Sequence, residues 1–145
     1  LALGVALPGR LVTAPAANAP AATTVGWVAF DRGAIARRVS KGQVVFVDVT
    51  ADWCLTCKAN KTLVIDRDPV AGALAAPGVT PMQADWTRPD DRIARFLESH
   101  ERYGIPFNIV YGPGAPEGIA LPEVLSAGVV TDALDQAAGQ VSAGG

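Results

Sequence analysis

The stretch Val44-Val-Phe-Val-Asp-Val-Thr-Ala-Asp-Trp-Cys-Leu-Thr-Cys57 joins an apolar segment to a pair of cysteines. Residues 44–49 are β-branched or aromatic at every position except Asp48, without alternation, which predicts a strand covered on both faces of its sheet. A stretch suited to a helix follows as far as Ile65. The two cysteines therefore stand where a buried strand passes into a helix, the unit from which α/β domains are built.

Strands and helices alternate outward from this junction. We predict strands at 25–30, 79–84, 107–111 and 119–125, a turn at 112–118, and helices at 31–40, 69–75, 89–102 and 126–138. Asp31, Asp68 and Ser126 are suited to cap helices, with Pro69 at a first helical position, and Pro122 restricts the last strand to a sheet edge. This order predicts an α/β fold with a central mixed sheet and helices on both faces.

The composition excludes several classes of protein. The chain has 145 residues, 50% hydrophobic and 18% charged, which excludes a disordered chain. Its 12 basic and 14 acidic residues give a net charge of −2, so nothing recommends a nucleic-acid partner. A single histidine, His100, argues against a histidine-built metal site, and two cysteines are too few for a disulfide framework.

The chain divides into three parts by composition. Residues 1–22 are an apolar run followed by a Pro- and Ala-rich tether, which indicates either a linker or the remnant of a membrane helix, cut from a longer protein. No stretch reaches the ~20 apolar residues that a membrane-spanning helix needs. We expect one domain over 23–140 and a flexible tail over 141–145.

The cysteine pair Cys54-Leu-Thr-Cys57 points to redox chemistry. Unpaired amides at a helix N-terminus favour negative charge, so Cys54 can exist as the thiolate that attacks a partner's disulfide. Cys57 lies about one turn further on, where it can resolve the mixed disulfide. The alternatives are two ordinary buried thiols or half of a zinc site, but zinc requires four ligands and the chain offers no second pair. We therefore expect no metal and no cofactor beyond the Cys54–Cys57 disulfide.

Asp48 interrupts the apolar run of the central strand. A buried carboxyl has a raised pKa, and this one could accept the proton of Cys57 directly or through water. The alternative is an aspartate at a strand end that loop amides satisfy. We favour the functional reading because groups with perturbed pKa values cluster at active sites.

The segment Val47-Asp-Val-Thr-Ala-Asp-Trp-Cys-Leu-Thr-Cys-Lys58 resembles the active-site strand and helix of the thioredoxin superfamily. Gly104-Ile-Pro106 resembles the cis-proline loop of that superfamily. Together with Asp68-Pro-Val70, the pattern is closest to the periplasmic C-terminal domain of DsbD-type transmembrane thiol:disulfide interchange proteins, in particular the ScsB-like branch linked to copper tolerance.

The resemblance implies a protein-disulfide reductase domain in the periplasm, part of an inner-membrane protein. It would take electrons from a cysteine pair in that protein's membrane domain and pass them to oxidised periplasmic proteins, either thioredoxin-like proteins or isomerases. In this resemblance Cys54 matches the nucleophile, Cys57 the resolving cysteine, Asp48 the buried acid and Pro106 the cis-proline.

Neighbouring residues take supporting roles in this interpretation. Trp53 and Ile105 would contact the partner beside Pro106, although Trp53 could instead cover the core. Lys58 and Lys61 would tune thiol pKa values, although a helix lysine is commonly a solvated surface charge. Lys61 stands where DsbD domains often carry a second acid.

A second departure from the family pattern and the alternative functions remain at this point. Phe107 follows the proline where many thioredoxins have threonine, and Trp86, Phe96 and Tyr103 are assigned to packing. An oxidase or isomerase could use the same cysteines, and the dipeptide between them does not settle the direction of electron flow. A Cu(I)-binding module is a third alternative.

Overall fold

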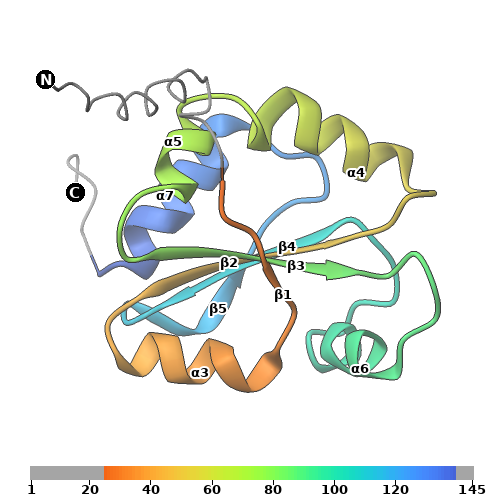
Figure 1. Cartoon of the computed structure of the whole chain (residues 1–145), viewed down its shortest axis with the longest axis horizontal. Helices are drawn as coiled ribbons and strands as arrows, with labels where there is room; N and C mark the ends of the chain where they lie inside the picture. The colour runs from red at the N-terminus through yellow and green to blue at the C-terminus, as the bar shows by residue number, and fades with distance from the viewer. Residues whose placement is uncertain (1–24, 140–145) are drawn as a thin grey trace, which may run out of the picture.

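The computed structural model describes residues 25–139, which form a five-stranded mixed sheet with helices on both faces (Figure 1). The strands lie in the order β1-β3-β2-β4-β5. Their bounds are β1 (Val28–Ala29), β2 (Val44–Thr50), β3 (Val79–Asp85), β4 (Phe107–Gly112) and β5 (Ala115–Ala120). β3 is parallel to β1 and β2, whereas β4 is antiparallel to both β2 and β5. The predicted α/β architecture with a mixed sheet is confirmed.

The helices divide between the two faces of the sheet. Their bounds are α3 (Arg32–Ser40), α4 (Leu55–Asn60), the π-helical turn η3 (Lys61–Ile65), α5 (Val70–Leu74), α6 (Asp91–Ser99) and α7 (Ala127–Ala137). Figure 1 shows α4, α5 and α7 above the sheet and α3 and α6 below it. No helix within residues 25–139 is long and apolar enough to cross a membrane.

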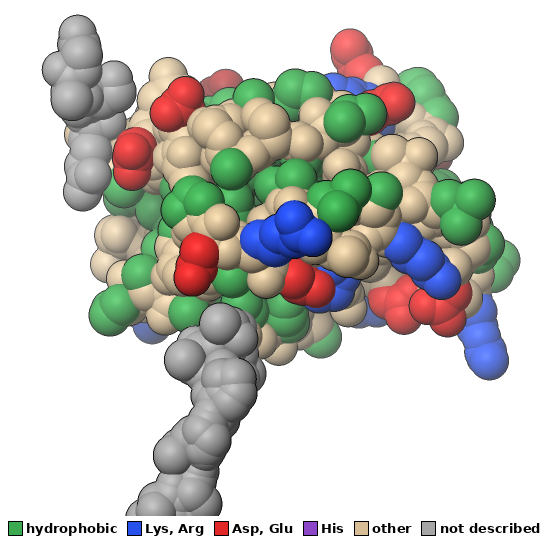
Figure 2. Space-filling view, turned by 90° about the horizontal axis from the view of Figure 1, so that it is seen from above, with side chains coloured by type: hydrophobic (Ala, Val, Ile, Leu, Met, Phe, Trp, Pro, Cys, Tyr) green, Lys and Arg blue, Asp and Glu red, His purple; other side chains and the backbone are tan. Residues whose placement is uncertain are grey.

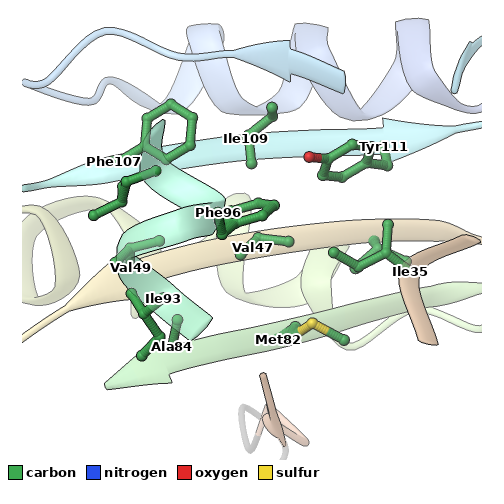
Figure 3. Close-up of a cluster of buried hydrophobic side chains, with 12 residues drawn as sticks. Ile35, Val47, Val49, Met82, Ala84, Ile93, Phe96, Phe107, Ile109 and Tyr111 are labelled. Atoms are coloured by element: carbon green, nitrogen blue, oxygen red, sulfur yellow. The ribbon is translucent and has the colours of Figure 1, made fainter. Parts of the chain in front are cut away.

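Strand β2 contributes to a core on each face, because successive side chains point to opposite sides. Val45, Val47 and Val49 face α3 and α6, where they pack with Phe96 (Figure 3). Phe46 faces the opposite way, into the core beneath α5 and α7. Coverage of both faces explains why polar and apolar residues do not alternate along this segment. Because side chains along β2 point alternately to the two faces, Asp48 lies on the same face as Phe46, the face that α4 covers.

Two of the predicted helix caps form as expected. The Asp31 carboxylate accepts a hydrogen bond from an amide in the first turn of α3, and Ser126 does the same for α7. The cap predicted for α5 is wrong by one residue. Pro69 occupies the N-cap position, and Asp68 Oδ1 instead accepts from the amide of Gly72 at 2.9 Å. The carboxylate of Asp68, one residue before the N-cap, still reaches a free amide in the first turn of α5. The sequence therefore correctly predicted that Asp68 caps this helix, but it placed the start of the helix one residue too early.

The turn predicted at 112–118 and the strand at 119–125 are wrong. Pro113 and Gly114 alone form the turn, and β5 begins at Ala115. The amide of Gly114 donates to the carbonyl of Ala137 at 2.8 Å, so packing against the end of α7 places this tight turn. Pro122 therefore lies outside the strand, and it is Pro116 that stands in the edge strand.

Other boundaries differ less. β1 has two residues rather than six, and α6 begins and ends inside its predicted range. The predicted linker at 1–22 and tail at 141–145 lie outside the described residues.

Candidate active site

The two cysteines form a disulfide at the start of α4. Cys54 is the N-cap residue, and its Sγ accepts a hydrogen bond from the amide of Cys57 at 3.1 Å. Their Cα atoms are 5.3 Å apart, and both residues are buried. α4 continues into η3 without a break in helical backbone, so Cys54 stands at the N-terminus of both. This end of a helix favours negative charge, which would stabilise a Cys54 thiolate once the disulfide is reduced.

The loop that carries the cysteines is tied to the loop after β3. The amide of Asp52 donates to Thr87 Oγ1 at 2.9 Å, and the indole Nε1 of Trp53 donates to the carbonyl of Thr87 at 3.2 Å. Cys54 in turn donates its amide to the carbonyl of Ala51 at 3.1 Å. These bonds hold Trp53 beside the disulfide with 60% of its surface exposed.

An open groove of about 520 Å³ lies next to Trp53. Its lining is largely aromatic and apolar and includes Trp53, Trp86, Pro89, Tyr103 and Ile105. Tyr103 is 76% exposed, so its assignment to packing is wrong: it follows the end of α6 and lies outside the core. Seen from above, the end of the molecule where α4 begins carries hydrophobic side chains among a few charged ones (Figure 2).

The proline loop also packs against the cysteines. Ile105 packs against Ala51, Cys54 and Cys57, and the Ile105–Pro106 peptide bond is cis. The structure thus brings Trp53 and Ile105 to one groove beside the disulfide, and Pro106 follows Ile105 in the same loop. Phe107, the departure from threonine, points into the core and contacts Phe96.

Asp48 is buried in β2, where its carboxylate accepts a hydrogen bond from Asn108 Nδ2 at 2.7 Å. Burial raises the pKa of Asp48 to about 6, against the lowering effects of the Asn108 bond and of the charge on Lys61; the charge on Asp66 raises it further. No loop amide within residues 25–139 donates to this carboxylate, so the alternative of a loop-satisfied strand end is wrong. An acid with this pKa changes its charge near neutral pH.

The two lysines are placed differently. Lys58 is exposed on α4 and forms no ion pair within the described part of the chain. Lys61 Nζ lies 2.9 Å from Asp66 Oδ1 and 5.4 Å from the ring centre of Trp27. The charge of Lys61 lowers the pKa of Asp48, while the lysine side chain itself contacts Asp66 and Trp27.

Asn108 is the site residue that the sequence analysis missed. It stands in β4 directly opposite Asp48, and the two positions are 60 residues apart in the chain. A signal was present, because Asn108 interrupts the apolar run 107–111 as Asp48 interrupts 44–49. The antiparallel register of these two strands was needed to connect them.

Comparison with known proteins agrees with this arrangement. The profile of the thioredoxin-like family matches residues 27–113. The chain belongs to the thioredoxin-like family. No curated protein sequence matches it.

Solved structures share the thioredoxin-like fold. The oxidised C-terminal domain of DsbD from Neisseria meningitidis matches with a TM-score of 0.59 at 19% identity, over 73% of this chain and 91% of that one. The reduced form of that domain matches with a TM-score of 0.55 at 19% identity, over 76% and 99%. A thioredoxin from Thermus thermophilus matches with a TM-score of 0.57 at 19% identity, over 77% and 85%. The predicted thioredoxin-like fold is confirmed.

A thioredoxin-like domain with a Cys54–Cys57 pair at a helix N-terminus is equipped for thiol–disulfide exchange, and this supports a thiol:disulfide oxidoreductase. Within residues 25–139, no three His, Cys, Asp or Glu side chains gather as a metal site would require.

Proposed function

We propose that this domain is a protein-disulfide reductase that passes electrons from a membrane-embedded cysteine pair to oxidised periplasmic proteins. The observation that carries the proposal is the Cys54–Cys57 disulfide at the start of α4, on the sheet face toward which β2 directs the buried acid Asp48. An acid with a pKa of about 6 suits a proton acceptor at neutral pH.

The first step is attack by Cys54. In the reduced domain its thiolate attacks one sulfur of the partner's disulfide, so that a mixed disulfide forms and the partner's other sulfur leaves as a thiolate. The helix N-terminus stabilises the attacking thiolate.

The second step is resolution by Cys57. Its thiol gives a proton to Asp48, directly or through water, and the resulting thiolate attacks Cys54 Sγ. The Cys54–Cys57 disulfide forms, the partner's remaining sulfur leaves as a thiolate, and two electrons have passed to the partner. A dithiol in the membrane domain would then reduce the pair again.

The partner would bind at the groove and at the proline loop. Trp53 and Tyr103 offer exposed aromatic surface there, of the kind that dominates binding energy at protein interfaces. An extended partner segment could pair with backbone beside Pro106.

The assignment of electron source and compartment rests on similarity and sequence. The DsbD domain has the same fold, and the apolar and Pro/Ala-rich stretch at 1–22 would connect this domain to a membrane segment. Thioredoxin-like proteins or isomerases of the periplasm are the proposed acceptors, and a role in copper tolerance follows from the ScsB-like pattern.

The reduction potential of the Cys54–Cys57 pair tests the direction of flow. Equilibration with glutathione should give a value near that of thioredoxin, about −270 mV, and a value near that of DsbA, about −120 mV, would instead identify an oxidase. In a second assay, the reduced domain should reduce an oxidised thioredoxin-like acceptor, and Cys57→Ser should leave it trapped as a mixed disulfide through Cys54.

A further inference from the structure

The buried side chain of Asn108 is hydrogen-bonded at only one end. Its Nδ2 donates to Asp48, but its Oδ1 has no hydrogen-bond partner within the described residues, although Asn108 is only 1% exposed. A buried acceptor without a donor is costly, so native proteins rarely retain one without a reason.

A second buried asparagine on the same side of the sheet shows the ordinary arrangement. Asn60 Nδ2 donates to the carbonyl of Glu123 at 2.8 Å, and its Oδ1 accepts from the amide of Leu125 at 3.0 Å. Both ends of that amide are bound to backbone, so its orientation is fixed. Among residues 25–139, the Asn108 side chain has instead a single partner, Asp48, and that partner can change its charge.

We propose that Asn108 is a positioning residue that turns its amide over to serve both charge states of Asp48. When Asp48 is ionised, Nδ2 donates to the carboxylate, as the structure shows. When Asp48 has taken up a proton, the amide rotates so that Oδ1 accepts from the new carboxyl O–H. The inference rests on the proposed function in one respect: the proton is the one that Cys57 releases during resolution.

The geometry allows this exchange without movement of the backbone. Asp48 and Asn108 are paired across β2 and β4, so the backbone of two strands fixes their separation. The amide oxygen and nitrogen of asparagine are nearly the same size, so a rotation exchanges acceptor and donor without changing the volume filled. The orphaned Oδ1 then accepts from the protonated carboxyl group of Asp48, and Nδ2 takes the unpaired position in its place.

Other groups around Asp48 do not replace this bond. Lys61 and Asp66, which form an ion pair with each other, act on Asp48 in opposite directions through their charges. On β3 the residue opposite Asp48 is the uncharged Gln83. Asn108 is the side chain that bonds the carboxylate directly.

The first test measures the pKa of Asp48 by ¹³C NMR of the side-chain carboxyl group in the oxidised protein. Asn108→Leu should raise this pKa by about 1 unit, because a hydrogen bond to a charged group is about twice as strong as one between neutral groups. Asn60→Leu is the matched control, since it removes a buried amide that does not touch Asp48. An unchanged pKa in Asn108→Leu, or an equal rise in both variants, would overturn the proposal.

The second test needs no substitution at Asn108, so it stands even where Asn108→Leu fails to fold. Above the titration midpoint of Asp48, one side-chain amide proton of Asn108 should be shifted downfield and protected from exchange. Below the midpoint that proton should lose both properties, and the amide protons should show NOEs to groups on the side away from Asp48. Retention of the same protected proton at both pH values would overturn the proposal, and Asp48→Asn should abolish the pH response.

These results are independent of the direction of electron flow. A protein whose potential identifies it as an oxidase, but whose Asn108 amide turns over with Asp48, would contradict the proposed reductase and leave the inference standing. A protein whose potential identifies it as a reductase, but whose Asn108 amide stays fixed, would support the proposed function and overturn the inference about Asn108.

Discussion

Replacing Asp48 by asparagine should raise the free energy of unfolding of the oxidised protein above that of the wild type. This gain should be larger at neutral pH than at acidic pH. The substitution keeps the size of the side chain and an oxygen that can accept from Asn108 Nδ2, but it removes the buried charge. The wild-type protein must ionise Asp48 inside the sheet as the pH rises, whereas the variant need not.

The pKa of Asp48 gives the magnitude. Burial raises it to about 6 in the folded protein, against an ordinary value of about 3.9 in the unfolded chain. The folded state therefore binds more protons between these values, and the wild-type protein loses stability as the pH rises through 6. A difference of about 2 units at 1.36 kcal/mol each corresponds to about 3 kcal/mol, gained by Asp48→Asn between pH 3.5 and pH 8.

Urea denaturation of both oxidised proteins across this pH range measures the gain. The exposed Asp132 of α7 provides a control, because Asp132→Asn removes the same charge from the surface. A free-energy difference between Asp48→Asn and wild type that stays constant from pH 3.5 to pH 8 would refute the buried ionisation of Asp48.

The same variant should slow resolution of the mixed disulfide. Cys54 attacks at its usual rate, but Cys57 lacks its proton acceptor, so the mixed disulfide accumulates in a quenched gel assay. The defect should shrink toward pH 9 as Cys57 ionises unaided. An equal resolution rate in variant and wild type across pH 6 to 9 would make Asp48 a structural residue only.

Three further outcomes are expected. Iodoacetamide at neutral pH should label Cys54 of the reduced protein much faster than Cys57, as peptide mass spectrometry would show; preferential labelling of Cys57 would reverse their roles. Trp53→Ala should slow exchange with a protein partner by about tenfold while leaving exchange with a small disulfide nearly unchanged; equal slowing of both would remove Trp53 from the partner surface. Gly112→Ala should cost about 1 to 3 kcal/mol in urea denaturation, because its Cβ would collide with backbone in the last turn of α7, whereas Gly128→Ala meets open space and should be neutral or stabilising.

Local sequence patterns predicted the elements that carry the chemistry. The strand at 44–49 and the helix after it depend on side-chain type along a few residues, and the caps Asp31 and Ser126 depend on one hydrogen bond to a nearby amide. The position of the cysteines at a strand–helix junction follows from these local features. The sequence therefore sufficed for the fold class and for the Cys54–Cys57 pair.

Tertiary structure decided which side chains meet. The partner of Asp48 lies 60 residues away, and only the antiparallel register of β2 and β4 sets Asn108 opposite it. The attachment of Trp53 to Thr87 likewise depends on how two separate loops pack against each other.

The hairpin after β4 shows the same limit, since the end of α7 places its turn at Pro113 and Gly114. Register and loop placement are set by the packing of the whole core, which a window of neighbouring residues does not contain. For that reason the sequence by itself determined the cysteine pair and singled out Asp48, and the tertiary structure determined which side chains, Asn108 among them, lie against that carboxylate.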